Sequence, residues 1–281
     1  MIAVQRGYAY LLMVMLGVFA SPYFTGCEST FEPLQENGRY HFSIFGALDH
    51  SADTQWVRVM PIMDTVFVNS SEPIDAEVTM TRLSTGESSV LNDSLFRFSD
   101  RSIAWNFWTT TPVHADEEYM ITAMASDGSS SRATVSIPPA FPEPEVNYSF
   151  NDEEGIVNIS GVHQLVVADI IYTFTILTDA GETPNPIEIN ISHLDRLSHV
   201  SSSSYRFFPN DVGRIASEYG VTGERILIKK REVLVVSGSA EWPDFEELSE
   251  DEAFLPEINS NVEDGLGVLV GIVSKRLSLV P

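Results

Sequence analysis

Along most of the chain after residue 39, apolar and polar residues alternate with a period of two, which is the pattern of half-buried β-strands. The alternating segments are short and follow one another closely, and stretches with a helical period are scarce. This order of elements predicts antiparallel sandwiches rather than a parallel sheet with crossover helices. The clearest segments are residues 40–45, 55–60, 103–108, 170–176, 187–191 and 225–236.

Two hairpins are predicted from their turns. Residues 76–83 and 88–91 are joined by a turn that holds Gly86, and residues 119–125 and 132–137 are joined by a turn that holds Gly128. Glycine is the residue that most readily adopts the positive φ of a tight hairpin turn. Each pair of segments is therefore expected to form two adjacent antiparallel strands.

The approach to the second hairpin resembles the polar corner of immunoglobulin and fibronectin type III domains. In those domains a tyrosine begins a late strand, packs its ring inward and bonds backbone through its hydroxyl. Here the polar run Ala115-Asp116-Glu117-Glu118 precedes Tyr119. The resemblance implies an immunoglobulin-like first sandwich, and an ordinary strand tyrosine is the alternative.

A proline-rich segment divides the predicted strands into two groups. Four prolines lie between Pro138 and Pro144, where they remove backbone donors and stiffen the chain. We therefore predict an immunoglobulin-like domain over residues 39–138, a linker over 139–146 and a second antiparallel β domain over 147–281. Few contacts are expected to cross such a linker.

The second domain is predicted to hold one or two short helices and a closing strand. Capping residues and apolar spacing place the helices at residues 210–220 and 244–254. The run 268–273 is apolar on both faces, so it should form a strand buried between layers rather than an edge. Gly265 and Gly267 before it suit a tight turn or a bulge. An exposed tail or a partner-docking strand is the alternative for this last segment.

The chain begins with a predicted signal peptide, residues 1–26. Arg6 supplies one positive charge, and the apolar run that follows from Tyr8 to Ala20 would span about 20 Å as a helix, too short for a hydrocarbon core of roughly 30 Å. The four residues that end at Cys27 resemble the bacterial lipoprotein box, although Leu is more usual than Phe24. The resemblance implies that Cys27 becomes the lipidated N-terminus, bearing palmitate-type chains, and that residues 27–38 form a tether.

Composition supports export and narrows the choice of partners. Cys27 is the only cysteine, and an unpaired thiol in an exported protein needs the explanation that lipidation provides, a chance cysteine being the alternative. The formal charge is −24, and removal of a signal peptide whose one charged residue is Arg6 leaves −25. This acidity argues against nucleic acid as a partner and against adhesion to anionic membranes. Lipid rather than charge is expected to hold the protein to a membrane.

No motif predicts a catalytic site, a metal or a cofactor. There is no Gly-x-Ser-x-Gly elbow, and the spacing of His193 and His199 around Asp195 fits no usual zinc site. The acidic clusters near residues 151–155 and 246–252 lack the alternation of a calcium-binding EF-hand. The chain is therefore predicted not to be an enzyme. A β-scaffold hydrolase stays open only if the fold assembles a carboxylate pair or a Ser–His contact.

One aromatic run is the candidate binding element. In residues 103–108, alternation puts Trp105 and Phe107 on one face of the strand and Trp108 on the other. If the second face is exposed, Trp108 with Trp56 or Tyr119 would form a platform for sugar or peptide. The alternative is that a loop or the second domain covers Trp108. The candidate ligand-binding residues are therefore Trp56, Trp105 and Trp108.

The predicted mature chain also resembles a family of uncharacterised bacterial outer-membrane lipoproteins, a domain family of unknown function. The resemblance rests on the lipoprotein box, on residues 127–138 and on the closing residues 256–269, in which Asn261, Gly265 and Gly267-Val268 form the most specific pattern. It implies a protein anchored in the outer membrane, in a leaflet that stays open, and often associated with TonB-dependent receptors. It supplies no catalytic residue.

Two functional hypotheses follow. The leading one is a non-enzymatic cell-envelope lipoprotein that acts as a binding or accessory partner of an outer-membrane transport complex. The runner-up is a carbohydrate- or peptide-binding surface lipoprotein. Exposure of Trp56, Trp105 or Trp108 in a concave surface would favour the second hypothesis.

Overall fold

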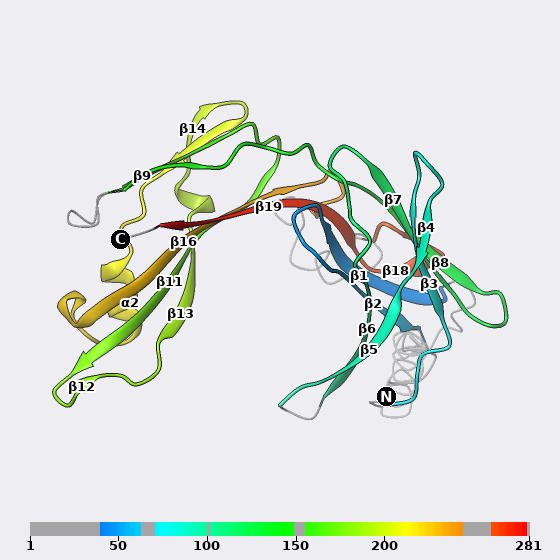
Figure 1. Cartoon of the computed structure of the whole chain (residues 1–281), viewed down its shortest axis with the longest axis horizontal. Coiled ribbons are helices and arrows are strands. Elements are labelled where there is room, and N and C mark those ends of the chain that lie inside the picture. Colours follow the sequence, from blue (N-terminus) through cyan, green and yellow to red (C-terminus); the bar gives the residue numbers. More distant parts are fainter. Residues whose placement is uncertain (1–39, 63–70, 100–101, 149–154, 244–259, 280–281) are drawn as a thin grey trace, which may run out of the picture. The chain divides into compact units, whose positions relative to one another are not determined.

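The computed structural model describes residues 40–62, 71–99, 102–148, 155–243 and 260–279 (Figure 1). The chain separates into two compact units, residues 1–37 and 38–281, and every described residue belongs to the second unit. The predicted signal peptide, Cys27 with its tether, and the helix predicted at 244–254 lie outside the described residues.

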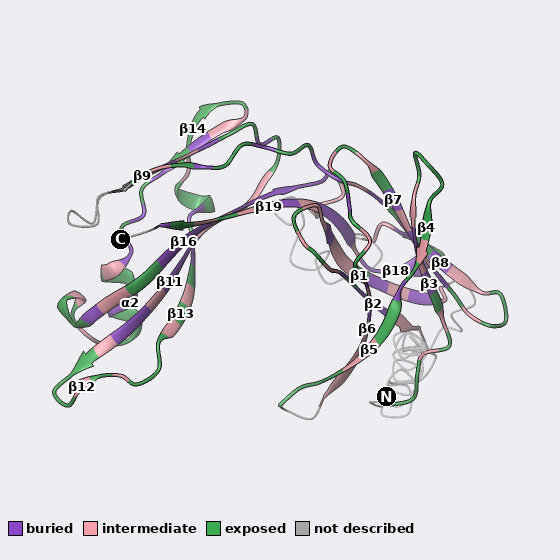
Figure 2. Cartoon of the chain, in the orientation of Figure 1, coloured by how far each residue is buried: buried purple, intermediate pink, exposed green. Residues whose placement is uncertain are grey.

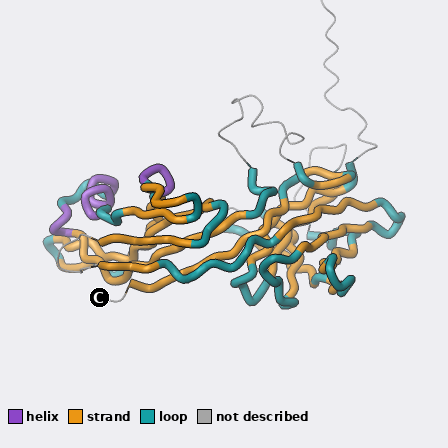
Figure 3. Tube along the Cα trace, turned by 90° about the horizontal axis from the view of Figure 1, so that it is seen from above, coloured by secondary structure: helices purple, strands orange, loops and turns teal. Residues whose placement is uncertain are grey.

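The described residues are mostly β-strand, which confirms the predicted fold class (Figure 3). Within the described ranges, helical turns occur only in the second half of the chain, at η2 (Leu194–Arg196), α2 (Val212–Glu218) and η3 (Gly223–Arg225). The α2 helix confirms the helix predicted at 210–220. It is followed by Gly220, whose φ is +64°.

The first half of the chain forms a sandwich, to which the closing segment adds strand β17. One of its sheets has the spatial order β1-β2-β6-β5, and the other has the order β17-β8-β7-β3-β4. Both predicted hairpins are confirmed, because β3 pairs with β4 and β7 pairs with β8 in antiparallel register. The strands are β1 (Phe42–Asp49), β2 (Gln55–Pro61), β3 (Glu77–Arg82), β4 (Ser88–Val90), β5 (Asn92–Arg97), β6 (Ile103–Thr109), β7 (Glu118–Met124), β8 (Ser130–Ser136) and β17 (Val262–Glu263).

The second half contains the remaining strands of the larger, ten-stranded sheet and a separate four-stranded sheet of order β14-β15-β10-β9. In the larger sheet β11 is flanked by β16 on one side and by β13 and β12 on the other. The strands are β9 (Glu145–Tyr148), β10 (Gly155–Ser160), β11 (Leu165–Thr178), β12 (Gly181–Glu182), β13 (Ile187–Ser192), β14 (Ser198–Ser201), β15 (Ser204–Phe207) and β16 (Ile226–Gly238).

Alternate residues of the strands point into the core, as the period of two predicts (Figure 2). Ile44 and Val59 in the first half and Ile170 and Val233 in the second are fully buried. Buried aliphatic side chains of this kind contribute about 1.5–3 kcal/mol each to stability. The core therefore follows directly from the sequence pattern.

The closing strand β19 (Leu269–Leu279) joins the sheets of the two halves. Its residues Leu269–Ile272 pair in parallel with β1, and residues Ile272–Leu279 pair in antiparallel register with β16. Because β19 has a neighbour on each side and Leu269 and Val273 are fully buried, the prediction of a buried strand rather than an edge is confirmed.

The strand pairing differs from the predicted bounds of the second domain, residues 147–281. β17 pairs with β8, and β18 (Gly265–Leu266) pairs with β1, so the chain returns to the first sandwich before it completes the second sheet. Contacts between the halves are thus more extensive than a linker alone would give. Local periodicity does not encode such pairing, because the partners lie far apart in the sequence.

Asn261 and Gly267, in the closing motif of the sequence, hold the chain where it comes back to the first sandwich. The Asn261 side chain donates to the carbonyl of Leu269 at 2.6 Å and accepts from the N–H of the same residue at 2.9 Å. Gly267 has a φ of +122°, and a Cβ at this position would collide with the backbone of Ile44. These residues fix the turn that sets β19 beside β1.

The proline-rich segment packs against the fold on one side. Pro138, Phe141 and Pro144 are buried, while Pro139, Ala140, Pro142 and Glu143 between them are exposed. A buried residue at every third position matches the three-residue turn of an extended polyproline helix.

Candidate functional site

The outer face of the β1-β2-β6-β5 sheet carries a group of aromatic side chains. Residues opposite each other in an antiparallel pair point to the same face. The register sets Trp56 opposite Trp108 and Phe45 opposite Arg58, and Phe96 lies opposite Ala104 on this same face. We call Phe45, Trp56, Phe96 and Trp108 the aromatic face.

Trp56 lies between two other rings of the aromatic face. Its ring centroid is 5.3 Å from that of Phe96, edge to face, and 6.1 Å from that of Trp108. These separations fall within the range in which aromatic rings attract one another. Trp56 is nevertheless 41% exposed, Phe45 44% and Phe96 38%. The rings of the aromatic face are therefore packed against one another and still open to solvent.

A shallow hollow beside Trp56 supplies polar partners. Arg58 Nε donates to Asn106 Oδ1 at 3.5 Å, which holds the guanidinium and the amide next to each other. Ring surface next to a few convergent polar groups is the usual composition of a small-ligand site. The hollow is lined by Phe45, Gly46, Trp56, Arg58, Met60 and Asn106.

The structure separates the residues that the sequence grouped. Trp56 and Trp108 share the aromatic face, but Trp105 lies with Phe107 on the opposite face of β6, as alternation predicts. Trp105 is half-buried, and its Nε1 has no hydrogen-bond partner among the described residues. Tyr119, the other residue considered for the platform, is 2% exposed and belongs to the core.

Phe45 and Phe96 were not predicted as members of the site. Phe45 occupies an outward position of the first alternating segment, so its exposure was a usable signal. Phe96 belongs to β5, whose mixed sequence Asn-Asp-Ser-Leu-Phe-Arg gives no clear period. Its contact with Trp56 joins two strands that are not adjacent in the sheet, and only the fold provides it.

Tyr119 forms the corner that the sequence suggests. Its ring is buried, and its hydroxyl accepts the N–H of His114 at 3.0 Å. Beside it, Arg82 Nη2 and Ser84 Oγ both donate to the Glu117 carboxylate at 2.5 Å. These hydrogen bonds lower the pKa of Glu117 to about 2, so Glu117 is ionised at neutral pH and balances the charge of Arg82.

The second half contains a buried ionic cluster that the sequence analysis missed. His193 and Asp211 are 0% and 1% exposed, and His193 Nε2 and the Tyr172 hydroxyl each lie 2.9 Å from Asp211 Oδ2. The His193 ring also stacks on Phe207. Asp211 lies at the start of α2, yet its side chain makes no capping bond because the cluster engages it. The only signal in the sequence was the N-cap position of Asp211.

Several charges set the ionisation of Asp211. Burial by itself raises the pKa of its carboxyl, but the hydrogen bond and charge of His193, with Tyr172 and Arg196, outweigh burial and lower the pKa below its ordinary value. The ionised carboxylate accepts, and the His193 ring and the Tyr172 hydroxyl donate. Since neither His193 nor Asp211 is exposed, the cluster suits a structural role.

The described residues do not assemble the metal site considered around His193 and His199, and the acidic clusters at 151–154 and 246–252 lie outside the described residues. His199 lies in the exposed strand β14 beside Tyr205, whereas His193 is enclosed in the ionic cluster. Within the described ranges, no group of three or more His, Cys, Asp or Glu side chains could hold a metal ion. Over the same ranges, no helix is long and apolar enough to cross a bilayer.

The comparisons with known proteins identify no family for this chain. No family model matches the sequence, and no curated relative matches it. Among solved structures, a pullulanase from Anoxybacillus sp. LM18-11 in complex with maltotriose aligns over 69% of this chain and 23% of its own, with 10% identity and a TM-score of 0.22. A score this low supports no inference about fold or function.

Proposed function

We propose that this protein is a lipid-anchored envelope protein whose first sandwich binds a neutral oligosaccharide on the aromatic face. The observation that carries the proposal is the group of contacting rings Trp56, Phe96 and Trp108 next to Arg58 and Asn106. Trp56 and Phe96 are exposed and Trp108 is half-buried. Exposure of Trp56 at a hollow is the feature that separates the two hypotheses drawn from the sequence, and it favours the second one.

The chemistry of a sugar matches the aromatic face. A pyranose ring has C–H faces, which pack on indole and phenyl rings, and a rim of hydroxyls, which Arg58 and Asn106 can bind. Aromatic side chains also provide contact area at a low loss of conformational entropy. The face lies across the middle of a sheet, whereas peptides that bind sheets usually pair with a free edge. The formal charge of −24 repels anionic ligands, so the favoured saccharide is neutral.

Replacement of Trp56 with alanine should weaken oligosaccharide binding at least tenfold, because the substitution removes the ring that contacts both Phe96 and Trp108. A tenfold loss corresponds to about 1.4 kcal/mol, which is within reach of one aromatic contact and its buried area. The measurement is calorimetric titration of residues 28–281 with maltohexaose and cellohexaose, an α-linked and a β-linked glucan.

Two variants serve as controls for this titration. Phe208→Ala removes an aromatic side chain that is 57% exposed in the second half, and Trp105→Phe alters the opposite face of β6. Both should bind as the unmodified protein does. The proposal fails if the unmodified protein binds neither glucan and no other neutral glycan on an array, or if Trp56→Ala keeps full affinity.

The proposed anchor rests on Cys27. Cys27→Ser should release the protein from membranes or hold it as an uncleaved precursor, because the thiol is the acylated atom and lipidation precedes cleavage. Membrane fractionation and intact mass are the measurements, with Ser29→Ala as a control that keeps the thiol. A Cys27→Ser protein with normal mass and unchanged fractionation would contradict the anchor.

The outer-membrane location and the association with a TonB-dependent receptor rest on the family resemblance and stay predictions. Co-purification of the tagged protein from detergent-solubilised outer membranes, with identification of its partners, would test both. Trp56→Ala in the same experiment shows whether a captured partner is held through the aromatic face.

A further inference from the structure

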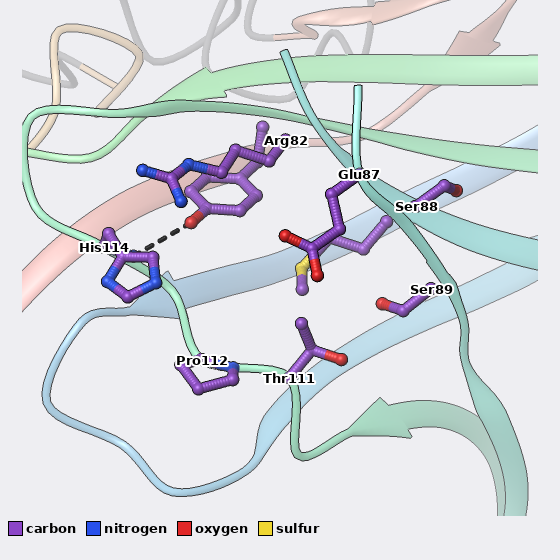
Figure 4. A pocket seen from close by; sticks show the side chains of 9 residues that line it. Arg82, Glu87, Ser88, Ser89, Thr111, Pro112 and His114 are labelled. Carbon is purple, nitrogen blue, oxygen red and sulfur yellow. Dashed lines mark hydrogen bonds between the residues drawn. The ribbon is translucent and has the colours of Figure 1, made fainter. Parts of the chain in front are cut away.

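A small pocket lies at the tyrosine corner and shares no residue with the aromatic face (Figure 4). It opens between the β3–β4 hairpin and the segment that leads from β6 into β7. We call it the corner pocket. Its polar lining is provided by Arg82, Glu87, Ser89, Thr111, His114 and Tyr119.

Two polar atoms of these lining residues are buried and have no hydrogen-bond partner within the described part of the chain. They are Nε of Arg82 and Oγ of Ser89. The other end of the Arg82 guanidinium already donates to Glu117. Buried polar atoms are nearly always satisfied in native proteins, by protein, ordered water or a bound group. These two atoms therefore call for an ordered water or a polar group of a ligand at the wall of the pocket.

Further polar groups face the same space. Figure 4 shows the Glu87 carboxylate, the Thr111 hydroxyl-bearing side chain and the His114 ring around the pocket. The Tyr119 hydroxyl accepts the His114 N–H and keeps its own proton to donate. Acceptors and donors thus come from the β3–β4 hairpin, from β7 and from the segment before it.

Size and charge select the class of ligand. The pocket holds about 140 Å³, close to the roughly 150 Å³ of an engineered cavity in another protein that accommodates one benzene ring. Glu117 balances Arg82, so Glu87 leaves the site with an excess negative charge that disfavours anions. A neutral ring that bears hydroxyls can donate to Glu87 and accept from Arg82 and Ser89.

We propose that the corner pocket binds a single neutral pyranose unit. The proposal does not rest on the function of the aromatic face, because the aromatic face is an open surface that suits a chain of sugars and the corner pocket has room for one ring. The two sites can therefore be tested with different ligands and different variants.

The experiment is saturation-transfer NMR and titration of residues 28–281 with D-glucose, D-galactose, D-mannose and D-xylose. At least one of these pyranoses should bind, and Glu87→Gln and Ser89→Ala should each weaken it at least fivefold. Trp56→Ala should leave this binding unchanged. Glu118→Gln, which alters an exposed carboxylate on β7 outside the pocket, is the matched control and should bind normally.

Each contrary outcome overturns the proposal. Absence of binding for all four sugars at tens of millimolar would mean that only water fills the pocket. Binding that survives both pocket variants, or that is lost in Trp56→Ala alone, would place the sugar elsewhere. Glu87 is exposed on a hairpin, so Glu87→Gln keeps the fold and is decisive even if Ser89→Ala does not.

Discussion

Deletion of residues 265–281 should unfold both halves of the chain rather than the second half alone. The deletion removes β18 and β19, which leaves β1 and β16 without the strand that lies between them. It also removes the buried side chains of Leu269, Val270, Val273 and Leu279. At about 1.5–3 kcal/mol each, their loss rivals the roughly 5–15 kcal/mol stability of a whole domain.

Tryptophan fluorescence and far-UV circular dichroism in urea test this expectation together. Trp56, Trp105 and Trp108 lie in the first sandwich, and the fourth tryptophan, Trp242, follows β16 in the second half. In a Trp242→Phe background fluorescence therefore follows the first half, while circular dichroism follows both. Loss of the fluorescence transition is the expected result. A truncated protein that melts like the full chain but loses an envelope partner would instead make residues 265–281 a docking segment.

A point variant tests the same strand without removing it. A Cβ on Gly271 would collide with the carbonyl of Ser136 on β8, so Gly271→Ala should lower the unfolding midpoint. Gly213→Ala is the matched control, because a Cβ there meets nothing within 4 Å and alanine favours the α2 helix. It should leave the midpoint unchanged or raise it.

The sequence predicts those features of the fold that depend on neighbouring residues. The alternation of residues 55–60 predicts β2, Gly86 and Gly128 predict the two hairpin turns, and the polar corner before Tyr119 predicts its inward ring. In each case the signal and the structure it specifies lie within a few residues of each other. Period, turn chemistry and capping are local properties, so a single sequence carries them.

Features that join distant residues were not predicted. The parallel pairing of β19 with β1 depends on Asn261 and Gly267, which read in the sequence only as part of a motif. The contact of Trp56 with Phe96 needs the order β2-β6-β5, which strand periods do not give. The unpaired atoms of the corner pocket likewise become visible only once the two walls are in place.

The ionic cluster shows the same limit for charged residues. In the sequence His193 and His199 flank Asp195 with a spacing that fits no usual zinc site, and in the structure the partner of His193 is Asp211 from another element. The β11 strand supplies Tyr172 and the segment before α2 supplies Asp211, and neither residue has a sequence neighbour that marks its role. The cluster is buried because β11, β15 and the segment before α2 pack together around it. No local sequence pattern indicates this packing.

Asp211→Asn should destabilise the protein by about 3 kcal/mol or more. The substitution removes the charge that accepts from both His193 and Tyr172 in a site that water does not reach, and it leaves Arg196 without its carboxylate partner. Breaking a buried ionic contact by removing one partner is strongly destabilising, because the remaining polar groups stay desolvated. Urea unfolding followed by circular dichroism measures the change.

The stability that the Asp211 carboxylate contributes depends on pH. Since the folded pKa of Asp211 lies below its ordinary value of 3.8, the carboxylate stabilises the folded chain fully above pH 3.8, and this contribution is lost as the pH falls below that value. The difference between the original protein and Asp211→Asn should therefore be largest near neutral pH and shrink in acid. Asp179→Asn, which alters a carboxylate that is 96% exposed and paired with Arg225, should change neither the stability nor its pH profile. An Asp211→Asn protein as stable as the original at pH 7 would show that the buried cluster contributes nothing to the fold.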